Sequence, residues 1–252
     1  MTVVFVHGNP ETTAVWDALI QALDRKDTTC ISPPGFGAPA PEGWGATRED
    51  YRDWLIEVLE GFGTPVDLVG HDWGAGHVAE VAMSRPDLLR SWCIDVAGVF
   101  HPDYVWHDFA QTWQTPGEGE AAIADLVNAS KEDQTAFLAS LMPSPDVAER
   151  LADAFNATTG RCILALYRSA AQPAMAKAGE RLPEAAQRPG LVVIPTEDPY
   201  VGTEEMARAS AERAGADVAV LDGLGHWWMV EDPQRGAGVL TRFWSSLRDK
   251  VQ

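Results

Sequence analysis

Residues 70–74 read Gly-His-Asp-Trp-Gly and decide the fold of this 252-residue chain. They lie between an apolar run at residues 66–69 and a segment typical of a helix at residues 75–84. A strand that enters a helix through Gly-x-nucleophile-x-Gly forms a nucleophile elbow, a turn tight enough to need glycines beside the reactive residue. Asp72 occupies the reactive position. Because a carboxylate is already anionic at neutral pH, its natural targets are saturated carbons that carry a leaving group.

Apolar runs alternate with amphipathic segments along most of the chain. Six short runs indicate buried strands, at residues 3–6, 29–32, 66–69, 92–96, 191–195 and 217–221. Amphipathic segments indicate helices at residues 16–23, 48–59, 75–84, 204–214 and 236–248. This alternation predicts an α/β fold with right-handed crossovers, in which helices flank a mostly parallel sheet of about six strands. Loops at the carboxyl ends of the strands then face a common crevice where the chemistry is expected.

The interval at residues 99–188 interrupts the alternation. It is rich in alanine and other helix formers, contains Pro-Gly and Pro-Ser-Pro breaks, and has no convincing strand. We therefore predict a helical cap at residues 99–188, inserted after the fourth strand into a core formed by residues 1–98 and 189–252. Such a cap walls the crevice and excludes water.

Composition narrows the choice of partners and location. A net charge of -18 and a pI near 4.6 argue against nucleic acid and against anionic membrane surfaces, which both attract basic proteins. The three cysteines are scattered and form no Cys-x-x-Cys pair, which indicates a reducing interior. No signal-like segment precedes the first strand and no apolar run reaches membrane-spanning length, so a cytoplasmic protein is expected.

Strand-end loops supply further candidate residues. The loop at residues 7–10, His-Gly-Asn-Pro, can offer a backbone N–H that joins the N–H after the nucleophile in holding an oxyanion, so Asn9 and Trp73 are the expected donors. Asp198 follows the fifth strand and can orient a histidine from the last strand. His226 lies there, beside glycines that let the loop fold back into the crevice. The order nucleophile, acid, histidine is the one found with a nucleophile elbow.

At these residues the chain resembles the aspartate-nucleophile branch of the α/β-hydrolase superfamily, which contains haloalkane dehalogenases and epoxide hydrolases. The resemblance extends over about residues 3–244 and implies an α/β-hydrolase fold. It implies that Asp72 displaces a leaving group from carbon, and that water activated by His226, itself held by Asp198, hydrolyses the resulting ester. No metal or organic cofactor is implied. Asp95, at the end of the fourth strand, is the alternative triad acid, because some dehalogenases place theirs there.

The resemblance leaves two leaving groups open. An asparagine after His-Gly and a tryptophan after the nucleophile resemble the halide-binding pair of haloalkane dehalogenases, so Asn9 and Trp73 favour an alkyl halide. An epoxide oxygen instead needs a proton donor, and Tyr167 resembles one of the cap tyrosines of epoxide hydrolases. Phe109 stands about where their second tyrosine is expected, which favours the dehalogenase. A non-catalytic binding protein on the same fold is the third hypothesis.

Aromatic residues of the cap and of the histidine loop are expected to line the pocket for a small apolar organic substrate: Trp106, Phe109, Trp113 and Trp227. His77, His101 and His107 are expected to be solvated or on the cap surface. Relatives usually have two more strands before the strand at residues 3–6, so the sheet is expected to start with an exposed or otherwise covered edge. A monomer or a homodimer through this edge is therefore expected.

Overall fold

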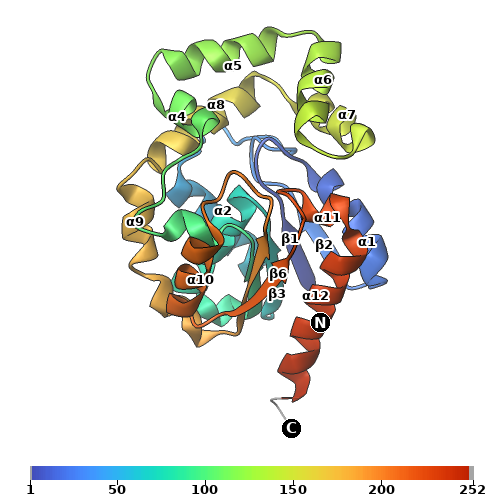
Figure 1. Ribbon diagram of the computed structural model, residues 1–252. Helices are drawn as coiled ribbons and strands as arrows, with labels where there is room; N and C mark the ends of the chain where they lie inside the picture. The colour runs from blue at the N-terminus through green and yellow to red at the C-terminus, as the bar shows by residue number, and fades with distance from the viewer. Residues whose placement is uncertain (1, 250–252) are drawn as a thin grey trace.

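The computed structural model describes residues 2–249 and contains a sheet of six parallel strands in the order β2-β1-β3-β4-β5-β6 (Figure 1). The strands are β1 Val3–Val6, β2 Thr28–Ile31, β3 Val66–Gly70, β4 Leu89–Ile94, β5 Gly190–Pro195 and β6 Asp217–Leu221. The predicted α/β class and strand number are confirmed. The largest difference concerns β4, which begins three residues before the predicted start, because Leu89 already pairs with Val66 of β3.

The first strand is not at the edge of the sheet. β1 pairs with β2 on one side and with β3 on the other, so the outer strands are β2 and β6. The expected edge at the start of the sheet is therefore formed by β2. The oligomeric state stays a prediction.

Two hydrophobic clusters lie on opposite faces of the sheet, because successive strand side chains point to opposite sides. Val4 and Val6 pack in the cluster with α2 (Arg48–Glu60) and α3 (Trp73–Ser84). Val3 and Phe5 pack in the other cluster, where α1 (Asp17–Leu23) contacts α12 (Pro233–Asp249). α10 (Glu204–Arg213) and the short α11 (Trp228–Glu231) complete the core helices. The two layers of helices hold the sheet rigid beneath the loops that carry the site.

Helices alone fill the chain between β4 and β5. They are α4 Asp108–Gln114, α5 Glu118–Asn128, α6 Lys131–Leu141, α7 Pro145–Ala154, α8 Ala157–Ser169 and α9 Ala174–Gly179. Side chains of Ser130, Ser144 and Asn156 cap α6, α7 and α8, because each accepts a backbone N–H of the first helical turn. In Figure 1, α4 to α7 stand above the carboxyl ends of the strands. α9 instead packs against the 3-10 helix Ala97–Phe100, beside the sheet.

The turn from β3 into α3 leaves little room for side chains. Asp72 has φ 50° and ψ -128°, a conformation that L residues rarely adopt. A Cβ on Gly74 would collide with the carbonyl oxygen of Val6, and one on Gly70 would collide with the backbone of Ala75. Both glycines are needed because backbone, which cannot give way, approaches them.

No helix within residues 2–249 has the length and apolar character needed to cross a bilayer.

Gly74→Ala should therefore lower the free energy of unfolding by about 1–3 kcal/mol, the usual cost of overpacking a close contact. Gly238→Ala is the matched control, since a Cβ in the middle of α12 meets only the end of the Arg242 side chain. The control should be neutral or stabilising by up to about 1 kcal/mol. Urea unfolding followed by circular dichroism measures both variants. Equal stability of the two would contradict the proposed tightness of the turn.

Candidate active site

Three strand-end loops bring an acid, a histidine and the elbow carboxylate together. His226 Nδ1 lies 2.7 Å from Asp198 Oδ2, and His226 Nε2 lies 3.7 Å from Asp72 Oδ2. Asp198 is held in turn by the backbone N–H of Tyr200, which donates to its Oδ1 at 2.9 Å. The imidazole therefore stands between two carboxylates, one fixing its orientation and one at the tip of the elbow.

The carboxylate of Asp72 is held by the loop after β1. The backbone N–H of Asn9 donates to Asp72 Oδ1 at 2.9 Å. A Cβ on Gly8 would overlap the Asp72 carboxyl group, so this loop has no room for a side chain there. Asn9 itself is 7% exposed, and its side-chain amide makes no hydrogen bond of good geometry with another described residue. A buried amide without such a partner, beside the Asp72 carboxylate, is available to a ligand.

The charges of these groups are coupled. Burial raises the pKa of Asp72 to about 6, although the nearby His226 opposes this shift. Burial lowers the pKa of His226, but the charge of Asp198 and its hydrogen bond outweigh burial and raise that pKa above its ordinary value. Burial likewise raises the pKa of Asp198, but His226 outweighs it and the pKa is lowered. Asp72 thus gains a proton more readily than an ordinary aspartate.

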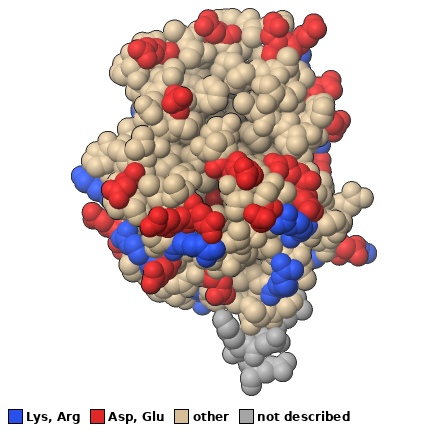
Figure 2. Space-filling model, viewed as in Figure 1, with Lys and Arg blue, Asp and Glu red and all other residues tan. Residues whose placement is uncertain are grey.

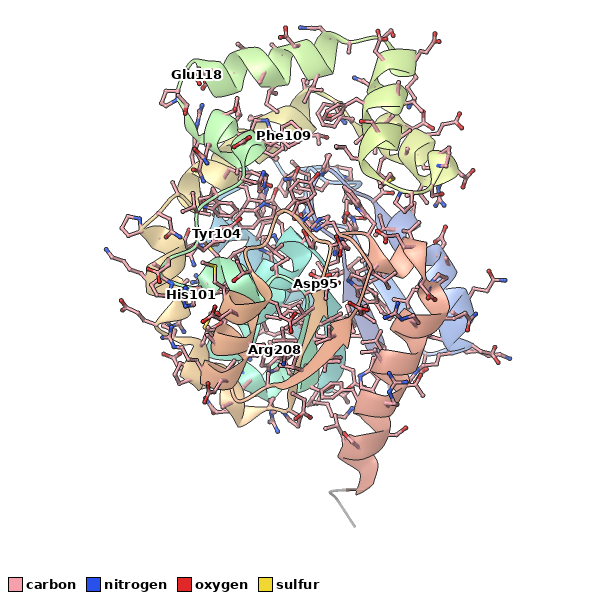
Figure 3. The ribbon with its side chains drawn as sticks, viewed as in Figure 1. Asp95, His101, Tyr104, Phe109, Glu118 and Arg208 are labelled. Atoms are coloured by element: carbon pink, nitrogen blue, oxygen red, sulfur yellow. The ribbon has the colours of Figure 1, made fainter. Side chains whose placement is uncertain are left out.

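Asp95, the alternative triad acid, does not contact His226. Its Oδ2 lies 2.6 Å from His71 Nδ1 and accepts the indole N–H of Trp228 at 2.8 Å, while its Oδ1 accepts the backbone N–H of Asp72 at 3.2 Å. Figure 3 shows Asp95 in the core, well below the cap. Asp198 is therefore the acid in contact with His226. Asp95 instead stabilises the elbow through its hydrogen bond with the backbone N–H of Asp72.

Glu11 makes the matching contacts on the other side of His71, and our sequence reasoning missed it. Glu11 Oε1 lies 3.1 Å from His71 Nε2 and accepts the indole N–H of Trp227 at 2.6 Å. Glu11 Oε2 accepts the backbone N–H of Gly8 at 2.9 Å. One carboxylate thus joins the loop after β1, the elbow and the histidine loop. In the sequence, only the position of Glu11 two residues after Asn9 pointed to a role for it at the site.

His71 is the positive centre of this network. Burial lowers the pKa of His71, but Glu11 and Asp95 outweigh burial and raise it well above its ordinary value. One ligand atom each from Glu11, His71 and His226 lies within 4.8 Å of the others, an arrangement that could in principle hold a metal ion. A protonated imidazole has no free lone pair, so this set fits an ion-pair network better than a metal site.

The cavity above Asp72 has aromatic walls. It has a volume of about 60 Å³ and is lined by Asn9, Pro10, Asp72, His107, Phe109, Trp113, Leu141, Tyr167, Tyr200, His226 and Trp227. A neighbouring cavity of about 30 Å³ shares Asp72 with it and includes Trp73 and Trp106. The four expected lining residues are thus divided between two adjacent cavities, with Trp106 in the second.

Tyr167 extends from α8 into both cavities. Its ring lies 5.2 Å from that of Trp73, and its hydroxyl group is close enough to Trp73 and Asn9 for both to favour its ionised form. Burial dominates, however, and raises its pKa well above the ordinary value. The Tyr104 hydroxyl donates to the carbonyl oxygen of Tyr200 at 2.6 Å, so this hydroxyl already has a hydrogen-bond acceptor in the core. Phe109 and Tyr104 are both labelled in Figure 3.

Three histidines were expected to be solvated or on the cap surface, and this was wrong for His77. His77 is fully buried in α3, where its ring stacks on Tyr51 at 4.8 Å and burial lowers its pKa to about 3. The reason is that α3 is covered on every side, so the usual polar face of a helix is missing. His107 lines both cavities, and burial lowers its pKa to about 4. His101 is partly exposed, as expected.

The sequence profile of the Alpha/beta hydrolase family matches residues 3–239. The chain belongs to this family. Among curated hydrolases it is 34% identical over 95 residues to an epoxide hydrolase of Caballeronia sordidicola, a match that covers 35% of this chain and 29% of that protein. It is 26% identical over 173 residues to a haloalkane dehalogenase of Mesorhizobium japonicum, covering 57% of this chain and 53% of that one. The chain thus spans about half or less of the length of these relatives.

Solved hydrolases share the fold. An E-2-(acetamidomethylene)succinate hydrolase superposes with a TM-score of 0.74 at 19% identity, covering 97% of this chain and 91% of the other. A haloalkane dehalogenase from Bradyrhizobium elkani superposes with a TM-score of 0.70 at 22% identity, with the same coverage. At such low identities the likeness extends to the fold of this chain and no further.

Glu11→Ala should lower the free energy of unfolding by about 3–5 kcal/mol, because it leaves a buried charge and two buried donors without their acceptor. Glu197→Ala, an exposed glutamate beside Asp198, is the control and should change stability by less than about 0.5 kcal/mol. Glu11→Gln keeps an acceptor and should lose less than the alanine variant. Urea unfolding tests the series, and a Glu11→Ala variant as stable as the control would exclude the network as a stabilising element.

Proposed function

We propose that this hydrolase cleaves carbon–halogen bonds through an alkyl ester on Asp72. The buried side-chain amide of Asn9 carries the proposal, because it lies next to the nucleophile without a well-formed hydrogen bond. A halide that leaves carbon inside a dry pocket needs N–H donors to share its charge. Asn9 offers an amide and Trp73 an indole, and both line the cavities at Asp72.

In the first step the Asp72 carboxylate attacks the carbon, the carbon–halogen bond breaks and the halide takes the bonding electrons. In the second step His226 removes a proton from water, and the resulting hydroxide attacks the ester carbonyl. The Asn9 N–H, which already donates to Asp72 Oδ1, stabilises the oxyanion together with the first free N–H of α3. When the tetrahedral intermediate collapses, the leaving oxygen takes the proton held by His226 and departs as the alcohol, and the acid left at Asp72 loses its proton to the solvent, which restores the carboxylate.

The coupled charges favour this order of steps. Asp72 in its ionised form is one cause of the raised pKa of His226. Esterification removes that negative charge, so the pKa of His226 falls once the ester has formed. The histidine therefore becomes a free base at the moment when water must be activated.

An epoxide is the second candidate substrate, because Tyr167 lies in the cavity beside Asp72 and the curated relatives include an epoxide hydrolase. Burial holds the Tyr167 hydroxyl in its protonated form, which is the form that can donate to an epoxide oxygen. The phenylalanine at position 109 and the engaged hydroxyl of Tyr104 leave Tyr167 without a second cap tyrosine as partner. The alkyl halide therefore remains the leading substrate class.

The pH dependence follows from the pKa of Asp72, about 6. Alkylation needs the ionised carboxylate, so kcat/KM should rise with pH through a midpoint near 6 and fall about tenfold per unit below it. The charge of His226 lowers the pKa of Asp72. In His226→Gln the midpoint of single-turnover alkylation should therefore move to higher pH. A midpoint that stays in place in this variant would contradict the charge coupling.

Trapping the ester distinguishes the two substrates. His226→Gln should accumulate a covalent adduct, because it can form the ester and cannot activate water. Intact-protein mass spectrometry after incubation with 1-bromobutane should show a butyl adduct, whereas styrene oxide should give a hydroxyalkyl adduct if the second candidate holds.

Asn9→Ala should lower kcat/KM for the halide about 10- to 100-fold, the effect of losing a hydrogen bond to a charged group.

Two controls accompany the trapping experiment. Asp72→Ala in the His226→Gln background should abolish the mass gain, which assigns the nucleophile. His101→Gln, at a partly exposed histidine outside the cavity, should accumulate no adduct. Absence of any adduct with both reagents would exclude the proposed covalent mechanism and favour a non-catalytic binding protein.

A further inference from the structure

His107 lies at the start of α4 in the cap, and its imidazole caps that helix. Its Nδ1 accepts the backbone N–H of Ala110 at 3.3 Å, as the side chain of an N-cap residue does. An uncharged imidazole accepts a hydrogen bond at one nitrogen and donates at the other. The contact with Ala110 therefore assigns the proton of His107 to Nε2, which becomes a hydrogen-bond donor.

The Nε2–H of His107 lacks a partner in the described chain, where no residue accepts a hydrogen bond from it. Burial lowers the pKa of His107 to about 4, and the nearby His226 lowers it too, while Asp198 opposes both effects only in part. The imidazole is therefore uncharged at neutral pH, so it offers a neutral N–H and not a cation. A partly buried donor without an acceptor needs an explanation.

His107 lies beside the carboxylate of Asp72, because it lines both of the cavities that contain Asp72. Its ring is 5.1 Å from the ring of Tyr200, which in turn lies 5.1 Å from the ring of His226. The ring of Tyr167 lies 6.1 Å from that of His107. The cap thus adds an N–H donor to the walls around the Asp72 carboxylate.

An unpaired N–H beside Asp72 disfavours a plain alkyl halide. Such a molecule would keep water from the N–H of His107 without offering an acceptor, and a site that donates a hydrogen bond rejects a ligand that cannot accept it. The cavity between Asp72 and His226 has a volume of about 60 Å³, so a bound molecule has few carbon atoms there. The acceptor for His107 is therefore expected close to the carbon that Asp72 attacks.

The surroundings indicate that this acceptor is an uncharged carbonyl oxygen. A hydroxyl group would bring a donor of its own, which could bind the Asp72 carboxylate and weaken it as a nucleophile. A carboxylate would need a cation, and the described residues that line the two cavities include no lysine or arginine. Figure 2 shows that Lys and Arg side chains of the visible face gather on its lower half, whereas Asp and Glu also cover the upper half, formed by the cap. This distribution does not attract an anion.

We infer that His107 is a specificity-determining residue, whose Nε2–H binds the carbonyl oxygen of a small α-halogenated ketone or amide. This inference rests on the proposed function and narrows its substrate class. Asp72 attacks the carbon next to the carbonyl group, and the halide leaves with the electrons of the carbon–halogen bond. One water then converts the ester into an α-hydroxy carbonyl compound, and one proton is released to the solvent.

Halide release tests the inference with two substrates of similar shape, bromoacetone and 1-bromopropane, and Asp72→Ala gives the background rate. His107→Ser removes the imidazole and keeps a side-chain cap for α4, since serine is a good N-cap residue. Its kcat/KM should fall about 3- to 10-fold more for bromoacetone than for 1-bromopropane, the effect of losing one hydrogen bond between uncharged groups. Each substrate is compared between variant and wild type, so the higher intrinsic reactivity of bromoacetone cancels. Equal losses for the two substrates would indicate a purely structural effect and would overturn the inference.

His101→Ser is the matched control. The Nδ1 of His101 likewise accepts a backbone N–H, that of Asp103 at 3.2 Å, but His101 is not among the described residues that line the cavities at Asp72. Figure 3 shows His101 beside the core, below Phe109 and the cap helices. This variant should leave the ratio of the two kcat/KM values unchanged.

A charged substrate gives a further comparison. Bromoacetate, which resembles bromoacetamide in shape, should react about tenfold more slowly than the amide, because its charge finds no partner in the cavity. Faster turnover of bromoacetate than of bromoacetamide would overturn the inference. A loss in His107→Ser that is confined to styrene oxide would overturn it as well, because the N–H would then serve an epoxide oxygen.

Binding without chemistry separates this inference from the proposed function. Butanone has the carbonyl group of bromoacetone and a methyl group in place of bromine, so it can bind and cannot react. Its dissociation constant, measured by NMR titration of the 252-residue chain, should rise about 3- to 10-fold in His107→Ser and stay unchanged in His101→Ser. This result without halide release from any substrate would refute the chemistry at Asp72 and leave the His107 contact established. Equal affinities of His107→Ser and the wild type for butanone would overturn the inference.

Discussion

The backbone conformation of Asp72 is the constraint on which the rest of the site depends. A non-glycine residue held at φ 50° costs about 1–3 kcal/mol, and it persists only if its surroundings leave no alternative. Here the surroundings are backbone atoms that nearly touch Gly70 and Gly74, together with hydrogen bonds to both ends of the residue. The strain presents the carboxylate at the end of the sheet, where the loops after β1, β5 and β6 can reach it.

The ion-pair network beneath Asp72 explains how three separate loops keep a common geometry. His71 lies between Glu11 and Asp95, and each carboxylate also accepts the indole N–H of a tryptophan that follows His226. The loop that carries the imidazole is therefore tied to the residue that precedes the nucleophile. Glu11, His71 and Asp95 below the elbow are paired with one another, while the Asn9 amide above it makes no well-formed hydrogen bond with another described residue, which is the expected distribution if the upper side is where a ligand binds.

The sequence predicted which residues form the site better than it predicted the side-chain contacts between them. Parallel strands end at the same edge of a sheet, so the chain order of Asp72, Asp198 and His226 was enough to bring them into one crevice. Glu11, Tyr200 and His107 were missed because their roles depend on side-chain directions across loops that are distant in sequence. His77 was misplaced because a single histidine in an apolar helix does not reveal that α3 is covered on every side. Such covering is a tertiary property and leaves no local periodic signal.

The core and the cap contribute different kinds of side chain to the candidate site. The charged groups at the site, Asp72, His226 and Asp198, come from the core, and the cap adds apolar and aromatic walls with the neutral Tyr167 and His107. Excluding water lowers the local dielectric, which strengthens the interactions among the core charges and accounts for the raised pKa of Asp72. Changes in the cap walls can thus alter which molecule reaches Asp72, because the cap acts on the charged groups of the core only through this indirect, electrostatic effect.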